Sequence, residues 1–225
     1  MKQIGILVAV EIGAVLKSDF TLKEQIAVGK FKVYKFEYSG RTIYVIHSGA
    51  GQVMAAAATE ILISIFKVDT IINFGIAGAL REDLGISSAS LVGGIVDYQF
   101  DTSEIDHVQP ARHVDYPSVV IPADEALLNK ALSIMPGIKT VSCLSGNKFV
   151  GSSEEKKSLA ARFNCDIVEM EAAAIELVAD MHSVPVLFIK GVSDSVNGGA
   201  AEFKTMFDES SESCFKIVTA LLKSL

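Results

Sequence analysis

The chain has 225 residues, half of them hydrophobic, and a formal net charge of −7. This much apolar material builds a large core, which excludes disorder, and the length favours one domain, residues 1–225. The acidic balance gives no reason to expect the basic face that nucleic acids require, so we expect a small-molecule partner and no nucleic acid. No apolar run approaches a membrane span, and three scattered cysteines indicate neither disulfides nor zinc, so we expect a cytoplasmic setting without a membrane partner.

Apolar runs bounded by turn residues alternate with helical patterns. Runs rich in valine and isoleucine predict strands at 4–10, 42–49, 70–78, 89–98, 140–146 and 184–194. Helical periodicity predicts helices at 51–67, 124–135, 153–164, 170–183 and 202–225, the third capped by Ser153. This alternation predicts a single-domain α/β fold, a three-layer α/β/α arrangement whose mixed, largely parallel sheet is covered by helices on both faces.

One long polar segment, 100–118, has no periodicity. Such insertions are typical of loops that cover a site or of subunit contacts. Both interpretations stay open at this point.

Ligands of open α/β sheets gather at the carboxyl ends of the strands. Two glycine-rich stretches, "SGAG" at 48–51 and "GIAGA" at 75–79, follow predicted strands and let the backbone approach a ligand. Neither is a dinucleotide fingerprint or a phosphate-binding loop, and similar turns also serve ordinary strand–helix packing. The stretches therefore indicate a candidate site without identifying its ligand.

Three acids follow predicted strands. Strand periodicity in "CDIVEM" places Glu169 and Glu171 on one side, with Val168 and Met170 on the other. A carboxylate there accepts hydrogen bonds from vicinal hydroxyls, and Asp194 in "VSDS" is a candidate proton donor. The alternative is that all three acids cap helix N-termini.

Five stretches, in this order and spacing, resemble one family. These are "SGAGQVMAAAATE", "IINFGIAGAL", "SGNKFV", "VEMEAAAIELVA" and "VSDS". They are similar to the bacterial 5′-methylthioadenosine/S-adenosylhomocysteine nucleosidases of the nucleoside phosphorylase superfamily, and the resemblance covers nearly the whole chain. It implies a homodimeric α/β enzyme that cleaves the N-glycosidic bond of a purine nucleoside without a cofactor.

The resemblance also implies catalytic roles. Glu171 would hold the ribose 2′ and 3′ hydroxyls, and Met170 would line the sugar. Asp194, steadied by Ser193, would protonate purine N7 as the base departs. This chemistry is coherent, because an acid at N7 lowers the barrier where negative charge develops.

A second group of residues would bind the base and the 5′ substituent. The resemblance implies that Phe149 stacks on the base and that the Val150 backbone reads its edge. Phe203 would match an apolar residue near the 5′ substituent. The expected substrate pocket also includes Ala77, Gly78 and Glu169.

Three departures from the family pattern lie on the nucleophile side. The glutamate that activates water in the family falls at Gly13 of "AVEIGAVL", with Glu11 two residues earlier. Ile76 replaces a serine, and Lys190 replaces an arginine. We predict a hydrolase whose activity depends on Glu11. If this stretch is a strand, Glu11 and Gly13 share a face, and the Glu11 carboxylate could reach the water. If a turn or helix starts here, Glu11 would instead be a cap or a surface charge.

Two alternatives stay open. A phosphorylase would use phosphate as nucleophile, but Asn73 and Ile76 stand where related enzymes have an arginine and a serine for the anion. A nucleoside-binding protein would keep the pocket without catalysis.

The four histidines lack the spacing of metal ligands, so no metal is expected.

Overall fold

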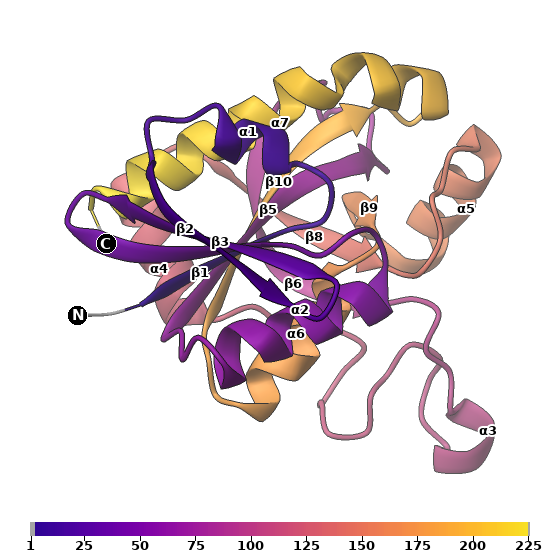
Figure 1. Ribbon diagram of the computed structural model, residues 1–225. Helices are drawn as coiled ribbons and strands as arrows, with labels where there is room; N and C mark the ends of the chain where they lie inside the picture. Colours follow the sequence, from indigo (N-terminus) through magenta and orange to yellow (C-terminus); the bar gives the residue numbers. More distant parts are fainter. Residues whose placement is uncertain (1–2, 225) are drawn as a thin grey trace.

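A mixed sheet with helices on both faces forms the body of the molecule in the computed structural model, which describes residues 3–224 (Figure 1). The strands are β1 (Ile4–Val8), β2 (Thr21–Val28), β3 (Phe31–Tyr38), β4 (Arg41–His47), β5 (Thr70–Ala79), β6 (Ala89–Asp97), β7 (Ile121–Pro122), β8 (Lys139–Ser145), β9 (Ile167–Glu169) and β10 (Val186–Asp194). The helices are α1 (Ile12–Leu16), α2 (Gln52–Ser64), α3 (Ser103–Asp106), α4 (Glu125–Ile134), α5 (Ser153–Phe163), α6 (Ala172–Met181) and α7 (Ala200–Leu222). The predicted α/β fold with helices on both faces is confirmed.

The strand order is β10-β6-β8-β9-β5-β1-β4-β3-β2, and a further pairing of β10 with β5 closes the first five strands into a ring. Pairing is parallel through β4, β1, β5 and β10, and antiparallel in the β2–β3–β4 meander and where β9 meets β5. Because β5 pairs with β1, β10 and β9, this one strand connects the ring to the rest of the sheet.

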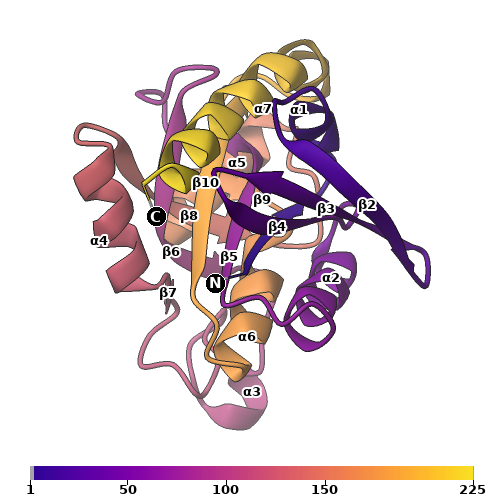
Figure 2. The same cartoon turned by 60° about the vertical axis from the view of Figure 1, so that its left-hand side comes forward.

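Each face of the sheet buries its own apolar cluster. Helix α7 presents Cys214, Val218 and Leu221 at helical spacing to the cluster that holds Phe74 and Ile189. Helices α2 and α6 cover the opposite face, as Figure 2 shows. Burial of one large apolar side chain contributes about 1.5–3 kcal/mol, so these two clusters hold the helices against the sheet.

The hairpin β2–β3 and helix α1 are absent from the elements predicted above. Strand β2 is mostly exposed and therefore lacks a long apolar run, and its turn to β3 uses Gly29 at a φ of +59°. The cap of α5 is also corrected, because Ser152 Oγ, not Ser153 Oγ, accepts from the Glu155 amide at 3.4 Å. These features depend on local turn geometry more than on hydrophobic periodicity.

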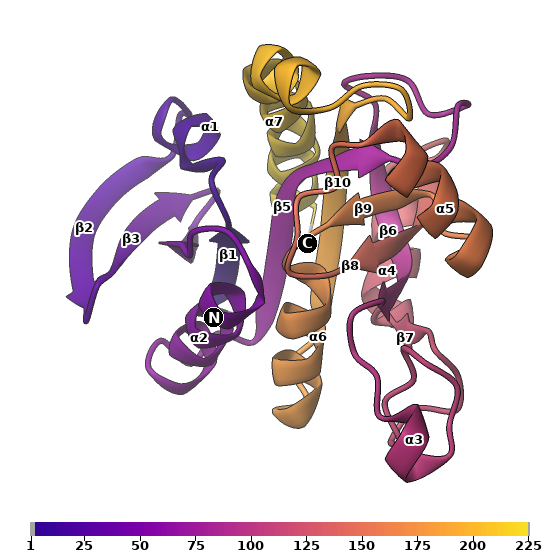
Figure 3. The same cartoon turned by 90° about the vertical axis from the view of Figure 1, so that its right-hand side faces the viewer.

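The polar segment 100–118 carries only the single turn α3 and projects from the body (Figures 1 and 3). In the described part of the chain, no helix is long and apolar enough to cross a membrane.

Candidate functional site

The ends of β9 and β10 meet at one residue of β5. Gly78 pairs with Val168 of β9 and with Asp194 of β10. The pairing of β10 with β5 shifts register between Val192 and Asp194. Such bulges are common next to active sites, where they change the direction in which a side chain points. A Cβ at Gly78 would lie 3.2 Å from Asp194 Oδ2, so a side chain here would crowd the Asp194 carboxyl group.

A cavity of about 260 Å³ opens beside this junction, close to the lower end of the range for small-ligand pockets. Every site residue predicted from the sequence lines it, namely Glu11, Ala77, Gly78, Phe149, Val150, Glu169, Met170, Glu171, Ser193, Asp194 and Phe203. Segment 100–118 contributes no described residue to its wall, so within this chain the segment does not cover the cavity.

Asp194 is buried on one side of the cavity, with 1% of its surface exposed. Its Oδ1 lies 2.7 Å from Ser193 Oγ, and its Oδ2 accepts a hydrogen bond from Lys156 Nζ. Lys156 comes from the first turn of α5, is fully buried, and also donates to the Ser195 carbonyl at 2.6 Å. A hydroxyl and a cation therefore fix the orientation of this carboxyl group.

Glu171 lies where the chain passes from β9 into α6. Its Oε1 accepts from the Gly51 amide at 2.7 Å, which connects it to the first glycine-rich turn. Although Glu171 is in the N-cap position of α6, its side chain makes no capping bond, so it faces the cavity. Burial, together with the charge of Glu169, raises the pKa of Glu171 to about 7.

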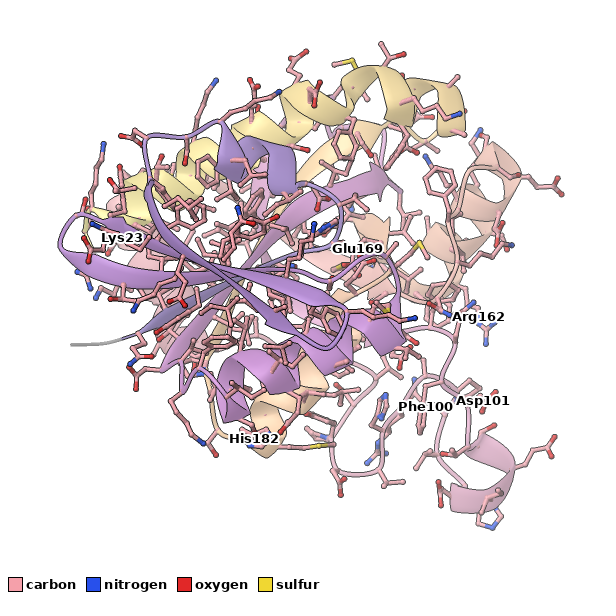
Figure 4. The ribbon with its side chains drawn as sticks, in the orientation of Figure 1. Lys23, Phe100, Asp101, Arg162, Glu169 and His182 are labelled. Atoms are coloured by element: carbon pink, nitrogen blue, oxygen red, sulfur yellow. The ribbon has the colours of Figure 1, made fainter. Side chains whose placement is uncertain are left out.

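Glu169 performs the capping role that was the alternative for all three acids. Its carboxylate accepts from the Ala172 amide at 3.0 Å and from the Lys190 ammonium at 2.8 Å. Burial acts to raise the pKa of Glu169, but Lys190 outweighs this and the pKa is lowered. Figure 4 shows Glu169 in the interior of the molecule, whereas Phe100 and Asp101 lie on the projecting segment.

The predicted separation of β9 side chains is wrong. Val168 and Met170 line the same cavity as Glu169 and Glu171, instead of facing away from it. The strand ends at Glu169 and the backbone then turns into α6, so the alternation of a strand does not continue through Met170.

Glu11 supplies a carboxylate on the third side of the cavity. The residue precedes α1 with 3% of its surface exposed, and its Oε1 accepts from the Ile76 amide at 3.1 Å while its Oε2 accepts from the Val10 amide at 2.9 Å. Glu11 is in the N-cap position of α1 and Gly13 lies inside that helix, so the two residues do not share a strand face. The Glu11 side chain nevertheless makes no capping hydrogen bond and is buried, so it is not a surface charge. Gly13 is exposed and does not line the cavity, so the acid facing this pocket comes from position 11.

An aromatic group forms the outer wall. The Phe149 ring contacts Phe203 edge-on with centroids 5.3 Å apart, and Phe203 in turn lies 5.9 Å from Phe207. Phe149 remains 42% exposed, which suits a flat ligand more than a core position. Val150 beside it is buried.

Lys156 is the functional candidate that the sequence interpretation missed. Its signal was present, because Leu159, Ala160 and Phe163 follow at helical spacing on the apolar face of α5 and Lys156 lies on that face. A lysine on an apolar face needs a buried partner.

Among the described residues, no group of three or more histidine, cysteine or acidic side chains is placed to hold a metal ion.

The chain matches known proteins along nearly its whole length. A family model described as the phosphorylase superfamily matches residues 3–223. A 5′-methylthioadenosine/S-adenosylhomocysteine nucleosidase of Staphylococcus aureus is 30% identical over 99% of this chain and 100% of its own length.

Solved structures give the same result. The futalosine hydrolase of Helicobacter pylori superposes with a TM-score of 0.92 at 27% identity, over 100% of this chain and 98% of its own. A second match is the 5′-methylthioadenosine/S-adenosylhomocysteine nucleosidase of H. pylori, solved in complex with a substituted pyrrolidinol. It superposes with a TM-score of 0.93 at 26% identity, over 100% of this chain and 99% of its own. The chain therefore belongs to the phosphorylase superfamily and, within it, to the family of 5′-methylthioadenosine/S-adenosylhomocysteine nucleosidases.

Proposed function

We propose that the protein hydrolyses the N-glycosidic bond of a purine nucleoside and uses Glu11 to activate the attacking water. The observation that carries this proposal is the convergence of three buried carboxyl groups, Asp194, Glu171 and Glu11, on one cavity with an aromatic outer wall. Hydrolysis of this bond requires a proton for the departing base, support for an electron-poor sugar and a base for the water.

Asp194 serves the leaving group. Its carboxyl proton passes to N7 of the purine while the bond between C1′ and the base breaks and its electron pair goes to the base. Phe149 lies on the same cavity and offers a ring on which the base stacks. Gly78 leaves room for a flat ring close to Asp194, because no side chain stands between them.

Glu171 and Glu11 serve the sugar and the water. The Glu171 carboxylate accepts hydrogen bonds from the ribose hydroxyls, which favours its charged form in the complex over the neutral form that burial favours in the empty pocket. Glu11 keeps free lone pairs after accepting from the Ile76 and Val10 amides, so it takes a proton from the attacking water.

The charges of the cavity disfavour phosphate as the nucleophile. Lys190, which replaces the arginine that the family has before the "SD" pair, forms an ion pair with Glu169. Asn73 is buried and its Nδ2 donates to the Leu7 carbonyl at 3.0 Å. A phosphate near Ile76 would face the Glu11 carboxylate, whose charge would repel it.

A panel of nucleosides tests the proposal. The purified protein is assayed against 5′-methylthioadenosine, S-adenosylhomocysteine, futalosine and adenosine, with and without phosphate, and the sugar product is identified by mass spectrometry. We expect free sugar at a rate independent of phosphate. Ribose 1-phosphate products would establish a phosphorylase, and binding of a nucleoside without cleavage would establish a binding protein.

We also propose a homodimer. A shallow apolar groove between α2 and α6 is lined by Val53, Ala56, Ala174, Leu177 and Val178, and Val53 is 77% exposed. Exposed apolar surface of this kind is typical of subunit contacts. Sedimentation equilibrium of the wild type and of Val53→Glu tests it, since the charge should shift the equilibrium toward monomer; a monomeric wild type would contradict the proposal.

A further inference from the structure

Lys156 is one of the largest fully buried side chains of the described chain, and its charge requires an explanation. Burying an ammonium group costs several kcal/mol unless partners compensate for the lost water. The Nζ atom has three acceptors: Asp194 Oδ2, the Ser195 carbonyl at 2.6 Å and the Gly198 carbonyl at 3.4 Å. All three lie on β10 or on the loop that follows it.

The lysine does not belong to the cavity wall itself. A Cβ at Gly78 would lie 3.4 Å from Lys156 Nζ and 3.2 Å from Asp194 Oδ2, so the ammonium lies beside the carboxyl group at the base of the junction. Lys156 is not among the residues that line the cavity. It therefore acts on a bound substrate through Asp194.

Other charges near the site have different partners. On the cavity wall, Glu169 pairs with Lys190, while Glu11 and Glu171 accept from backbone amides. Glu202 of α7 accepts from the Ser195 amide, and Lys148 pairs with Glu155. Among the described residues, Lys156 is the cation that forms an ion pair with Asp194.

We propose that Lys156 is a positioning residue that strengthens Asp194 as the acid for the departing purine. This inference rests on the proposed hydrolysis. When Asp194 gives its proton to N7, the C1′–base bond breaks, its electron pair goes to the base, and Asp194 becomes a carboxylate. The Lys156 ammonium stabilises that new negative charge, while the water that adds to C1′ gives its proton to Glu11.

This role has two consequences that a merely structural lysine would not have. A nearby cation favours the charged carboxylate, so it increases the drive for proton transfer and also reduces the fraction of protonated Asp194 at high pH. Removing the cation should slow purine release at low pH and move the alkaline limb of the rate profile to higher pH. For a substrate whose leaving group needs no proton, kcat should be nearly the same with and without the Lys156 cation.

The experiment compares Lys156→Met with wild type on two substrates between pH 5 and 9. 5′-Methylthioadenosine requires protonation of its base, whereas p-nitrophenyl β-D-ribofuranoside releases nitrophenolate without it. We expect kcat for 5′-methylthioadenosine to fall at least about tenfold at low pH, with a smaller deficit as pH rises, and kcat for the nitrophenyl riboside to change less than about threefold. Lys156→Arg, which keeps the cation, should restore part of the loss.

The control is Lys157→Met, the same charge change on the exposed side of α5, which should leave both activities unchanged. Equal losses on both substrates at every pH would overturn the proposal. If Lys156→Met does not fold, Lys156→Gln replaces it, because an amide still donates to Asp194 without a charge.

A readout without turnover separates this inference from the proposed function. The ¹³C signal of the Asp194 carboxyl group, assigned by its loss in Asp194→Asn, is followed against pH in wild type and in the Lys156 variant. We expect the signal to move at a higher pH in the variant, and coincident titrations would overturn the proposal. A wild type that cleaves no nucleoside would refute the proposed function while this titration still tests Lys156.

Discussion

Two buried lysine–carboxylate pairs lie on either side of the cavity, and they are used differently. Lys156 contacts Asp194, which itself faces the cavity. Lys190 contacts Glu169, whose carboxylate also caps α6, and no cation of residues 3–224 forms an ion pair with the neighbouring Glu171. Lys156 therefore pairs directly with the proposed acid Asp194, whereas Lys190 pairs with a helix-capping carboxylate next to Glu171.

The difference shows how position decides what a buried cation does. Glu169 has a lowered pKa because Lys190 is within hydrogen-bond distance, whereas burial and the charge of Glu169 raise the pKa of Glu171 to about 7. Two glutamates only two residues apart thus behave in opposite ways. The glutamate that we propose to bind the ribose hydroxyls is the one that Lys190 does not contact.

The largest effect is expected from Asp194→Asn on the leaving-group side. An amide cannot give a proton to N7, so turnover of 5′-methylthioadenosine should fall about 10²- to 10⁴-fold, while the circular dichroism spectrum and the affinity for adenine stay close to wild type. Steady-state kinetics and calorimetry measure the two. Activity within threefold of wild type would show that Asp194 is not the acid.

Lys190→Met removes the cation on the opposite side. The Glu169 carboxylate would remain buried without its partner, which should destabilise the fold by about 3–5 kcal/mol in urea unfolding. Lys23→Met is the matched control, because Lys23 pairs with Glu37 at 2.9 Å on the surface and such pairs contribute about 1 kcal/mol or less. Equal losses of unfolding free energy in the two variants would show that the buried Lys190–Glu169 pair contributes no more to stability than an exposed pair.

Glu11→Gln tests the third carboxylate. The glutamine can still accept from the Ile76 amide, so the site should keep its shape, but it cannot take a proton from water. We expect hydrolysis to fall at least about tenfold, without recovery on adding phosphate. Hydrolysis at the wild-type rate would assign the activation of water to another group.

Hydrophobic periodicity was enough to predict the α/β fold, and strand ends were enough to predict the glycine-rich turns and the three acids near the cavity, because ligand sites of such sheets gather where strands end. The aromatic wall of Phe149 and Phe203 was predicted only from the family resemblance. The direction of Glu11 was not predictable, since it depends on whether β1 continues or ends at Val8. The Lys156 contact joins residues 38 positions apart and depends on how α5 packs beside β10. Patterns in the sequence indicate which residues face a site, but not which charges meet there.

The last prediction concerns the pH dependence of the stability of the empty pocket. The folded-state pKa of Glu171 is raised to about 7, above the usual value near 4.5, so folding favours its neutral form. This contribution is fully present below about pH 4.5 and is lost as pH rises through about 7. Glu171→Gln, which is neutral at every pH, should therefore gain stability relative to wild type by roughly 1 kcal/mol per pH unit across that window.

Glu176→Gln provides the control for this last prediction, measured by urea unfolding of the ligand-free protein at pH 5 and pH 8. Burial first, and then the charges of Asp180 and Asp124, raise the pKa of Glu176 to about 8, and this residue does not line the cavity. Both variants should gain stability at pH 8 relative to pH 5, but only Glu171→Gln should lose nucleoside affinity, because only Glu171 faces the ligand. A gain in Glu176→Gln alone would mean that Glu171 is already charged in the empty pocket, and that burial and the charge of Glu169 do not outweigh the attraction of Lys190.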